Sequence, residues 1–295
     1  TRLKELLVLK QQKDEGEEKE EAGDYDDEGW KILDVATGTA DVALQLVDDL
    51  ASSSSSSSSS SETTKVVTVL GLDPSENMLA VGRNKIKTRK LQSQITLERA
   101  DARDLSHYYR DSTLSKKGGG EDDGTPQKQR NIQFDAATIA FGIRNVVPNR
   151  TQALCEIHKL LKPQGILAIL EFSQPTYEKN GILGYMAGLF IQHIVPVVGG
   201  LLSGGARKEY IHLQNSIAEF PTPLEFQSQL ESLHCELQED NNDYYFYTGY
   251  YEMEAVTQLN FGSVQLYLGR ASIRPKQKIV RNNSIPKLPP IQKVK

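Results

Sequence analysis

The first candidate functional residues along the sequence are an acidic residue and the small residues of the turn that follows it. A short apolar run reaches Asp34, small residues follow around Gly38, and a helical pattern of apolar residues starts at Val42. A strand, a tight turn and a helix in this order let the backbone approach a ligand closely, and they offer it the unpaired N–H groups of a helix N-terminus. The stretch therefore predicts a site for a nucleotide-type cofactor, although a loose glycine turn alone is common in α/β folds.

A second carboxylate, Asp73, ends an almost continuous apolar run over residues 66–73. Such a run is typical of a parallel strand that is buried on both faces. In doubly wound sheets, an acid at the end of the second strand can accept hydrogen bonds from both ribose hydroxyls of a nucleotide. Asp73 could equally cap the helix that begins at Pro74-Ser75, because aspartate is a favoured N-cap. We favour the ribose role, and the two roles can coexist.

Alternating strands and helices are expected to position these residues. A helix is predicted over residues 149–161, where the apolar residues share one face, and Pro163 and Gly165 end it. Further strands are predicted over residues 31–35, 95–100, 134–141 and 166–171. The alternation predicts an α/β fold with a doubly wound, mostly parallel sheet and helices on both faces.

The composition fits one enzyme-sized domain and argues against several other classes. With 295 residues, of which 38% are hydrophobic, the chain can bury one sizeable core plus extra material. Cys155 and Cys235 stand in apolar contexts, so the sequence predicts no disulfide framework and a reducing compartment. The five histidines show no metal-ligand spacing, so we expect no metal site. The net charge of −5 argues against nucleic-acid binding.

Several stretches interrupt the core pattern. Residues 1–30 contain an acidic stretch, residues 51–64 are mostly serine, and residues 112–130 are rich in glycine and charged side chains. None of them can bury apolar surface, so each is expected to be disordered. Residues 238–258 form another expected insertion, whose aromatic content favours a hairpin before a last strand at 262–267. The basic tail, 273–295, is expected to be solvated or to touch an anionic membrane surface.

Taken together, the motifs resemble those of one family, the C-methyltransferases of ubiquinone and menaquinone biosynthesis. The matching blocks are Asp34-x-x-x-Gly38, Asp73, Asp101-Ala102, Phe141-Gly142-Ile143-Arg144-Asn145-Val146, Leu161-Lys162-Pro163-x-Gly165, Leu170-Glu171-Phe172-Ser173 and Glu209-Tyr210-Ile211-His212-Leu213-x-x-Ser216-Ile217-x-x-Phe220-Pro221. The resemblance is greatest to the family's eukaryotic 2-methoxy-6-polyprenyl-1,4-benzoquinol methylases. It implies a class I SAM-dependent methyltransferase (Rossmann-like) fold over residues 31–272, with an antiparallel strand near the C-terminus.

The resemblance also implies how S-adenosylmethionine is bound. Gly38 and Thr39 would lie against its methionine portion, and Asp73 would accept the ribose hydroxyls. Asp101 and Ala102 would frame the adenine, because an aspartate can accept the adenine amino group and a small neighbour leaves room for the ring. Asp101 could instead be an acidic residue at the start of a helix.

Transfer of a methyl group to a ring carbon needs a second set of residues. A hydroquinone ring becomes a carbon nucleophile when a hydroxyl group is deprotonated, which requires a base or a group that stabilises the phenolate. We assign that stabilisation, or the orientation of a proton-accepting water, to Arg144, and hydrogen bonding of the substrate or that water to Asn145. Arg144 could instead be structural and bond loop carbonyls. Other candidate bases are Asp104, Glu171 and His193.

The longest uncharged stretch, residues 181–206, falls within a segment, 175–220, that the resemblance assigns to a lid over the substrate. Its length could suggest a membrane span, but Gln192, His193, Pro196 and repeated glycines argue against one. We expect an apolar lid and tunnel for a polyprenyl tail, with ordinary core helices as the alternative.

Four functions compete for this sequence. The leading prediction is S-adenosylmethionine-dependent C-methylation of a polyprenyl-benzoquinol in ubiquinone biosynthesis, and the alternative is the same chemistry on a naphthoquinol, as in demethylmenaquinone or demethylphylloquinol. An inactive methyltransferase-fold scaffold is supported by Ala40 and by the missing N-terminal part of the family motif. Ala40 stands where the family has a glycine, and its methyl group matters if the backbone needs a positive φ. An NAD dehydrogenase is disfavoured by the Leu-Lys-Pro-x-Gly turn at 161–165.

The resemblance further implies partners and a location. A polyprenyl quinol is the expected substrate, and peripheral contact with the mitochondrial inner membrane on its matrix side is expected, with a plastid as the alternative. Other quinone-biosynthesis proteins are expected partners, and a homo-oligomer is left open. Residues 1–4 resemble the end of a family motif, so we expect residues 1–30 to be a truncated N-terminal segment, from which targeting cannot be predicted.

Overall fold

The structure, a computed structural model, describes residues 29–51, 66–109, 133–173, 181, 207–238 and 246–274. Along the chain its helices and strands are β1 (Trp30–Val35), α2 (Asp41–Ala51), β2 (Val67–Asp73), α3 (Glu76–Thr88), β3 (Ile95–Arg99), η2 (Ser106–Tyr108), β4 (Phe134–Ala140), η4 (Ile143–Asn145), α4 (Arg150–Leu160), β5 (Leu161–Phe172), α7 (Arg207–Ala218), α8 (Pro223–Glu231), β6 (Cys235–Gln238), β7 (Phe246–Leu259), η6 (Asn260–Gly262) and β8 (Val264–Arg274). The serine and glycine-rich insertions, most of residues 1–30, nearly all of the expected lid before residue 207 and most of the basic tail lie outside the described residues.

The strands form one sheet in the order β3-β2-β1-β4-β5-β8-β7-β6. β1 to β5 pair in parallel, whereas β8 runs antiparallel to β5 and β7. This arrangement confirms the predicted α/β fold with a doubly wound, mostly parallel sheet and an antiparallel strand near the C-terminus. The strand order reverses between β1 and β4, and in such sheets ligands bind outside the carboxyl ends of the strands at that point.

The predicted elements differ from the observed ones mainly in the second half of the chain. β5 begins directly after α4, and its pairing with β4 passes from Leu161 to Ile166, so that Pro163 and Gly165 lie in an interruption of the ladder. A proline has no N–H to donate there, which suits an unpaired position. Residues 246–258, expected to belong to an inserted hairpin, instead form most of β7, a strand inside the sheet that pairs with β8 along its length and with the short β6 at its start. β8 continues well beyond residue 267, to Arg274.

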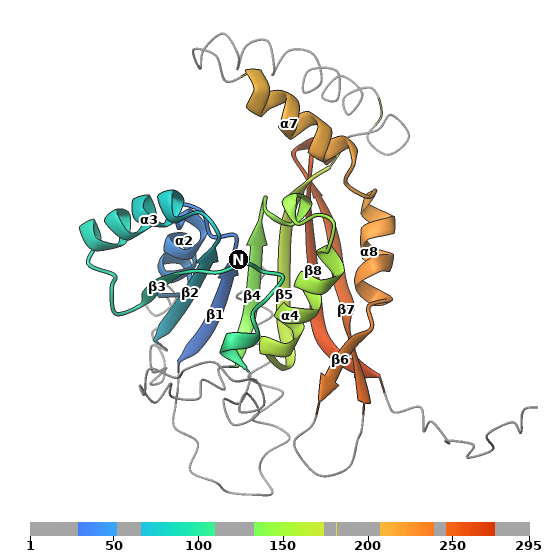
Figure 1. Cartoon of the computed structure of the whole chain (residues 1–295), viewed down its shortest axis with the longest axis horizontal. Helices are drawn as coiled ribbons and strands as arrows, with labels where there is room; N and C mark the ends of the chain where they lie inside the picture. Colours follow the sequence, from blue (N-terminus) through green and yellow to red (C-terminus); the bar gives the residue numbers. More distant parts are fainter. Residues whose placement is uncertain are drawn as a thin grey trace, which may run out of the picture.

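Helices cover both faces of the sheet (Figure 1). One face is packed by α4 and α8 through Leu154, Ile157, Leu160, Phe226 and Leu230. The other face is packed by α2 and α3 through Ala43, Leu44, Val47, Leu79 and Ile86. None of the described helices is long and apolar enough to cross a membrane.

Cys155 of α4 and Cys235 of β6 form a disulfide, so the prediction of no disulfide was wrong. The two residues are 80 positions apart in the sequence, and they meet because β6 forms the sheet edge that lies against α4. Apolar residues surround a cysteine whether it forms a disulfide between a helix and a strand or remains a free thiol in the core. The sequence alone does not show which strand lies beside α4, and the pairing could not be predicted from it.

Candidate functional site

Asp34, near the end of β1, is a buried carboxylate that fixes the turn after it. It accepts hydrogen bonds from the hydroxyl groups of Thr37 and Thr138, each with an O···O distance of 2.6 Å. Burial raises the pKa of Asp34 from 3.8 to about 6, the two hydroxyl donors act against that rise, and the charge of Asp73 adds to it. The side chain thus joins the turn after β1 to the neighbouring strand β4.

Asp73 connects the end of β2 to the same turn. One oxygen of its carboxylate accepts the backbone N–H of Gly38 at 2.9 Å, and the other accepts that of Ser75 at 2.8 Å. The N-cap of α3 is Ser75, whose side chain accepts the N–H of Met78, so Asp73 is not the cap that the alternative interpretation required. A carboxylate has about four acceptor positions, so Asp73 can still accept ribose hydroxyls.

Three residues of the turn between β1 and α2 have the left-handed backbone that favours glycine, and the first of them is Ala36, with φ +55°. Gly38 has φ +55° and Ala40 has φ +64°. A Cβ built on Gly38 would meet only Met78 Cε, at 3.4 Å, among the described residues, so the space above Gly38 is open to a ligand. The methyl group of Ala40 is fully buried and lies 3.1 Å from a Cβ built on Gly82 of α3. It therefore packs against α3 and does not enter the open space above Gly38.

Thr39, the other residue expected beside the methionine portion, is engaged in an exposed cluster. Its hydroxyl donates to Asp41 at 2.6 Å and accepts from Lys85 Nζ at 2.9 Å, and Lys85 and Asp41 form an ion pair. The side chain thus links the start of α2 to α3. A cofactor would contact Thr39 through its backbone or would compete with this cluster for the hydroxyl group.

Asp101, the expected adenine partner, lies exposed after β3 and is paired with Arg103. The guanidinium donates to both carboxylate oxygens, at 2.6 Å for Nη2, and lowers the pKa of Asp101. Ala102 is half-buried and packs on the core. The adjacent N–H of Ala100 donates to the carbonyl of Asp73 at 3.2 Å, which places this loop next to Asp73. An adenine amino group bound here would have to share Asp101 with Arg103.

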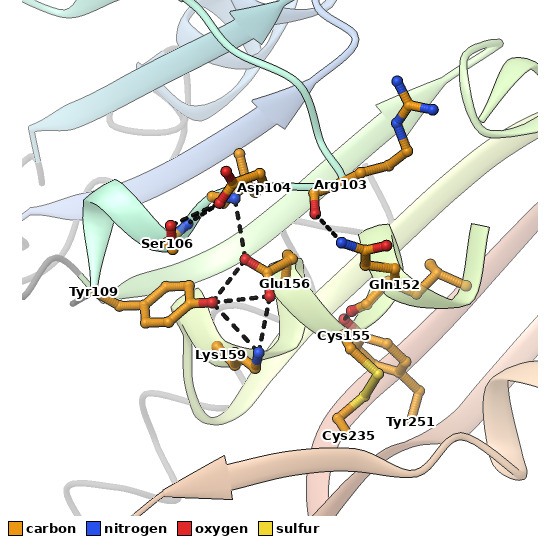
Figure 2. A network of polar contacts seen from close by, with 12 residues as sticks. Arg103, Asp104, Ser106, Tyr109, Gln152, Cys155, Glu156, Lys159, Cys235 and Tyr251 are labelled. Carbon is orange, nitrogen blue, oxygen red and sulfur yellow. Dashed lines mark hydrogen bonds and ion pairs between the residues drawn. A yellow bond between two sulfur atoms is a disulfide. The ribbon is translucent and has the colours of Figure 1, made fainter. Parts of the chain in front are cut away.

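A polar network that the sequence analysis missed holds this loop against α4 (Figure 2). The buried carboxylate of Glu156 accepts the N–H of Leu105, the hydroxyl of Tyr109 and the ammonium of Lys159. Gln152, one turn earlier, donates to the carbonyl of Arg103 at 2.7 Å. The sequence spacing shows the i,i+3 pair of Glu156 with Lys159, but it gives no signal for the contacts with Leu105 and Tyr109, which belong to a distant loop.

Arg144 lies in η4, after β4, and its guanidinium is nearly buried. Nη1 donates to Glu171 at 2.8 Å and to the carbonyl of Phe141, and Nε donates to Ser216 of α7 at 3.3 Å. Glu171 is fully buried at the end of β5 and also accepts the backbone N–H of Arg144 at 3.1 Å. Arg144 thus bonds a loop carbonyl, as the structural alternative expected. Its Nη2 group has no hydrogen-bond partner among the described residues.

The remaining predicted residues lie near this pair or outside the described part. Asn145 follows Arg144 in η4 and is exposed. Asp104, a candidate base, accepts from the hydroxyl of Ser106 at 2.6 Å, in the loop after β3. His193 falls outside the described residues.

The carboxyl ends of β1, β2 and β4 bring these groups to one edge of the sheet. A Cβ built on Gly142 would lie 2.4 Å from Cβ of Ala36, so the turn that carries Arg144 packs directly on the turn that carries Gly38. Asp73 reaches Gly38 from the other side. The structure therefore brings a glycine turn, a carboxylate and an arginine together at the carboxyl edge of the sheet.

The chain belongs to the ubiE/COQ5 methyltransferase family, whose model matches residues 3–114 and 123–249. It is 35% identical over 207 residues to the ubiquinone/menaquinone biosynthesis C-methyltransferase UbiE of Geobacter sulfurreducens, covering 70% of this chain and 64% of that protein. It is 34% identical over 205 residues to the demethylmenaquinone methyltransferase of Bacillus mycoides, covering 69% and 68% of the two chains. A SAM-dependent methyltransferase from Aquifex aeolicus is a structural neighbour with a TM-score of 0.43 and 13% identity, covering 83% and 82% of the chains. The chain spans slightly less than two thirds of the Geobacter protein.

Replacing Gly38 by Ala tests whether the space above the turn holds the cofactor. The new methyl group would enter that space, and we expect the dissociation constant for S-adenosylmethionine to rise about tenfold or more, or about 1.4 kcal/mol. Ala40→Gly is the matched control, because both positions have a positive φ but the methyl group of Ala40 packs against α3. Calorimetric titration of both variants measures the affinities. Equal affinities for Gly38→Ala and the wild type would remove Gly38 from the cofactor site.

Replacing Asp34 by asparagine tests the buried carboxyl group through the pH dependence of stability. Between about pH 4 and pH 6 the folded state holds a proton on Asp34 that the unfolded state has released. The free energy of unfolding of the wild type should therefore fall as the pH rises through this window, by about 3 kcal/mol from this group. The asparagine side chain does not titrate, so the variant should gain stability relative to the wild type as the pH rises. Urea denaturation at several pH values measures this, and a difference that stays constant or shrinks with pH would contradict it.

Proposed function

We propose that this protein transfers a methyl group from S-adenosylmethionine to a ring carbon of a polyprenyl-benzoquinol in ubiquinone biosynthesis. The observation that carries the proposal is the Nη2 group of Arg144, which has no partner among the described residues and stands on a turn packed against the Gly38 turn. Membership of the ubiE/COQ5 methyltransferase family supports the methyl donor and the quinol class. The benzoquinol ring is supported by the Phe141–Val146 and Leu170–Ser173 blocks.

The cofactor would be held by the first half of the sheet edge. S-adenosylmethionine supplies a methyl group that its positive sulfonium already activates. The open space above Gly38 accepts the ligand, and the unused acceptor positions of Asp73 suit two ribose hydroxyls. Positioning of the two reactants by such a site can supply about 7–11 kcal/mol of barrier reduction.

Arg144 would act on the ring. Its Nη1 group is held by the buried Glu171 at 2.8 Å, and this ion pair sets the direction of the free Nη2 donors, whereas the contact of Nε with Ser216 at 3.3 Å adds little to it. They can stabilise the oxygen of a hydroxyl group that loses its proton to water, which places electron density on the ortho carbon. That carbon gains the methyl group and releases its own proton, and the sulfonium becomes a neutral thioether. Asn145 would hydrogen-bond the ring or the water.

A naphthoquinol acceptor is the second candidate. It is supported by the similarity to the Bacillus mycoides demethylmenaquinone methyltransferase. The alternative that the protein is an inactive scaffold is no longer supported by Ala40, because the methyl group of Ala40 packs against α3 and away from the open space above Gly38. We also propose, from the resemblance to eukaryotic benzoquinol methylases, that the reaction takes place at the matrix side of the mitochondrial inner membrane, where a polyprenyl quinol would partition.

Arg144→Lys is the variant that tests the role of Arg144. Lysine keeps a charge beside the buried Glu171 but cannot supply the paired Nη2 donors, so we expect turnover to fall about a hundredfold or more. The affinity for S-adenosylmethionine should stay near that of the wild type. Mass spectrometry of the methylated ring with short-chain benzoquinol and naphthoquinol substrates measures turnover and separates the two candidates.

Ser216→Ala is the control, because it removes the contact to Nε and leaves Nη2 intact. We expect it to retain most of the turnover. Full turnover by Arg144→Lys, or loss of its cofactor affinity, would contradict the assignment. Absence of methylation of every quinol by the wild type would overturn the proposed function.

A further inference from the structure

Gln265 of β8 carries a buried acceptor that the fold does not satisfy. Among the described residues, two buried side-chain atoms have no hydrogen-bond partner, Gln265 Oε1 and His158 Nδ1. His158 is held at the amino end of β5 by the carbonyls of Tyr250 and Ser272, each at 3.1 Å from Nε2. Gln265 lies at the amino end of β8, beside the carboxyl end of β5, where Glu171 and the rest of the site are found.

The strand register places Gln265 beside the ion pair of the site. Gln265 is the antiparallel partner of Glu171, so the two side chains share a face of the sheet with Cβ atoms about 5 Å apart. Glu171 is the carboxylate that holds Arg144. Gln265 is 1% exposed and Glu171 is fully buried. The neutral amide of Gln265 therefore lies next to the ion pair of Glu171 and Arg144, on the β8 side of β5.

The unsatisfied atom defines the kind of group that would complete it. An amide oxygen only accepts hydrogen bonds, and leaving it unpaired in the interior is unfavourable. Glu171 is an acceptor as well, and the guanidinium of Arg144 faces Glu171, Phe141 and Ser216 through its fixed donors. The missing partner is therefore a donor that none of the described residues supplies, and a ligand at the carboxyl edge can supply it.

We propose that Gln265 Oε1 binds the ring hydroxyl that keeps its proton during methyl transfer. This inference rests on the proposed function. A quinol ring carries two hydroxyl groups, of which the one beside Arg144 loses its proton and needs donors, while the other remains a donor and needs an acceptor. Arg144 Nη2 would donate to the hydroxyl oxygen that loses its proton, and Gln265 Oε1 would accept from the hydroxyl that keeps it. Both groups adjoin Glu171. An oxidised quinone has carbonyl oxygens at both positions, so Gln265 selects the reduced ring.

Gln265→Leu is the variant that tests this role, with a quinol and its analogue that lacks the second hydroxyl group as substrates. We expect the wild type to show a KM for the analogue about tenfold above that for the quinol, which corresponds to about 1.4 kcal/mol. The variant should show an equally raised KM for both substrates, a nearly unchanged kcat and an unchanged dissociation constant for S-adenosylmethionine. Gln265→Met, which keeps the length of the side chain without the amide, should behave in the same way if Gln265→Leu folds poorly.

Gln258→Leu is the matched control. Gln258 is the β7 partner of Gln265 at the same level of the sheet, and it is exposed. This variant should leave the KM values of both substrates unchanged. A rise in the melting temperature of Gln265→Leu with an unchanged KM for the quinol would show that Gln265 is only an unsatisfied core residue. A wild type that binds S-adenosylmethionine and methylates no quinol would overturn the proposed function and, with it, this role.

Discussion

The hydrogen bonds of the Asp73 carboxylate are the constraint on which the site depends. One carboxylate oxygen accepts the N–H of Gly38 after β1, and the other accepts that of Ser75 at the start of α3. Hydrogen bonds from N–H groups to a charged carboxylate are stronger than those between neutral groups. They fix the spacing between the glycine turn and the end of β2, and this spacing decides whether one ligand can contact both.

The second half of the site is fixed by a different kind of interaction. Glu171 is fully buried, and its charge is balanced by Arg144 through the guanidinium and a backbone N–H. Removing one partner of such a pair would leave an uncompensated buried charge, which is strongly destabilising. The pair therefore holds η4 against β5, and the contact of Arg144 with Ser216 connects it to α7. The turns that carry Gly38 and Arg144 then meet through Ala36 and Gly142, which has no room for a side chain.

The sequence was sufficient to predict which residues of the site lie together wherever their position follows from the order of the strands. Parallel strands end at the same edge, so Asp34, Gly38, Asp73 and Arg144 could be placed together from the strand pattern alone. Partners that lie far apart in the chain could not be predicted. The bridge between Cys155 and Cys235 and the contacts of Glu156 depend on which loop or strand lies beside α4. The sequence signal for Gln265, a polar residue within an apolar strand, became informative only when the register placed it opposite Glu171.

The central claim is that the turn at Gly38 and the carboxylate of Asp73 hold an adenosyl group that carries a sulfonium. Isothermal titration calorimetry of the intact protein with S-adenosylmethionine and, separately, with NAD tests it most directly. The account predicts saturable binding of S-adenosylmethionine and no binding of NAD at the same concentrations. Binding of NAD, together with no heat from S-adenosylmethionine, would contradict it.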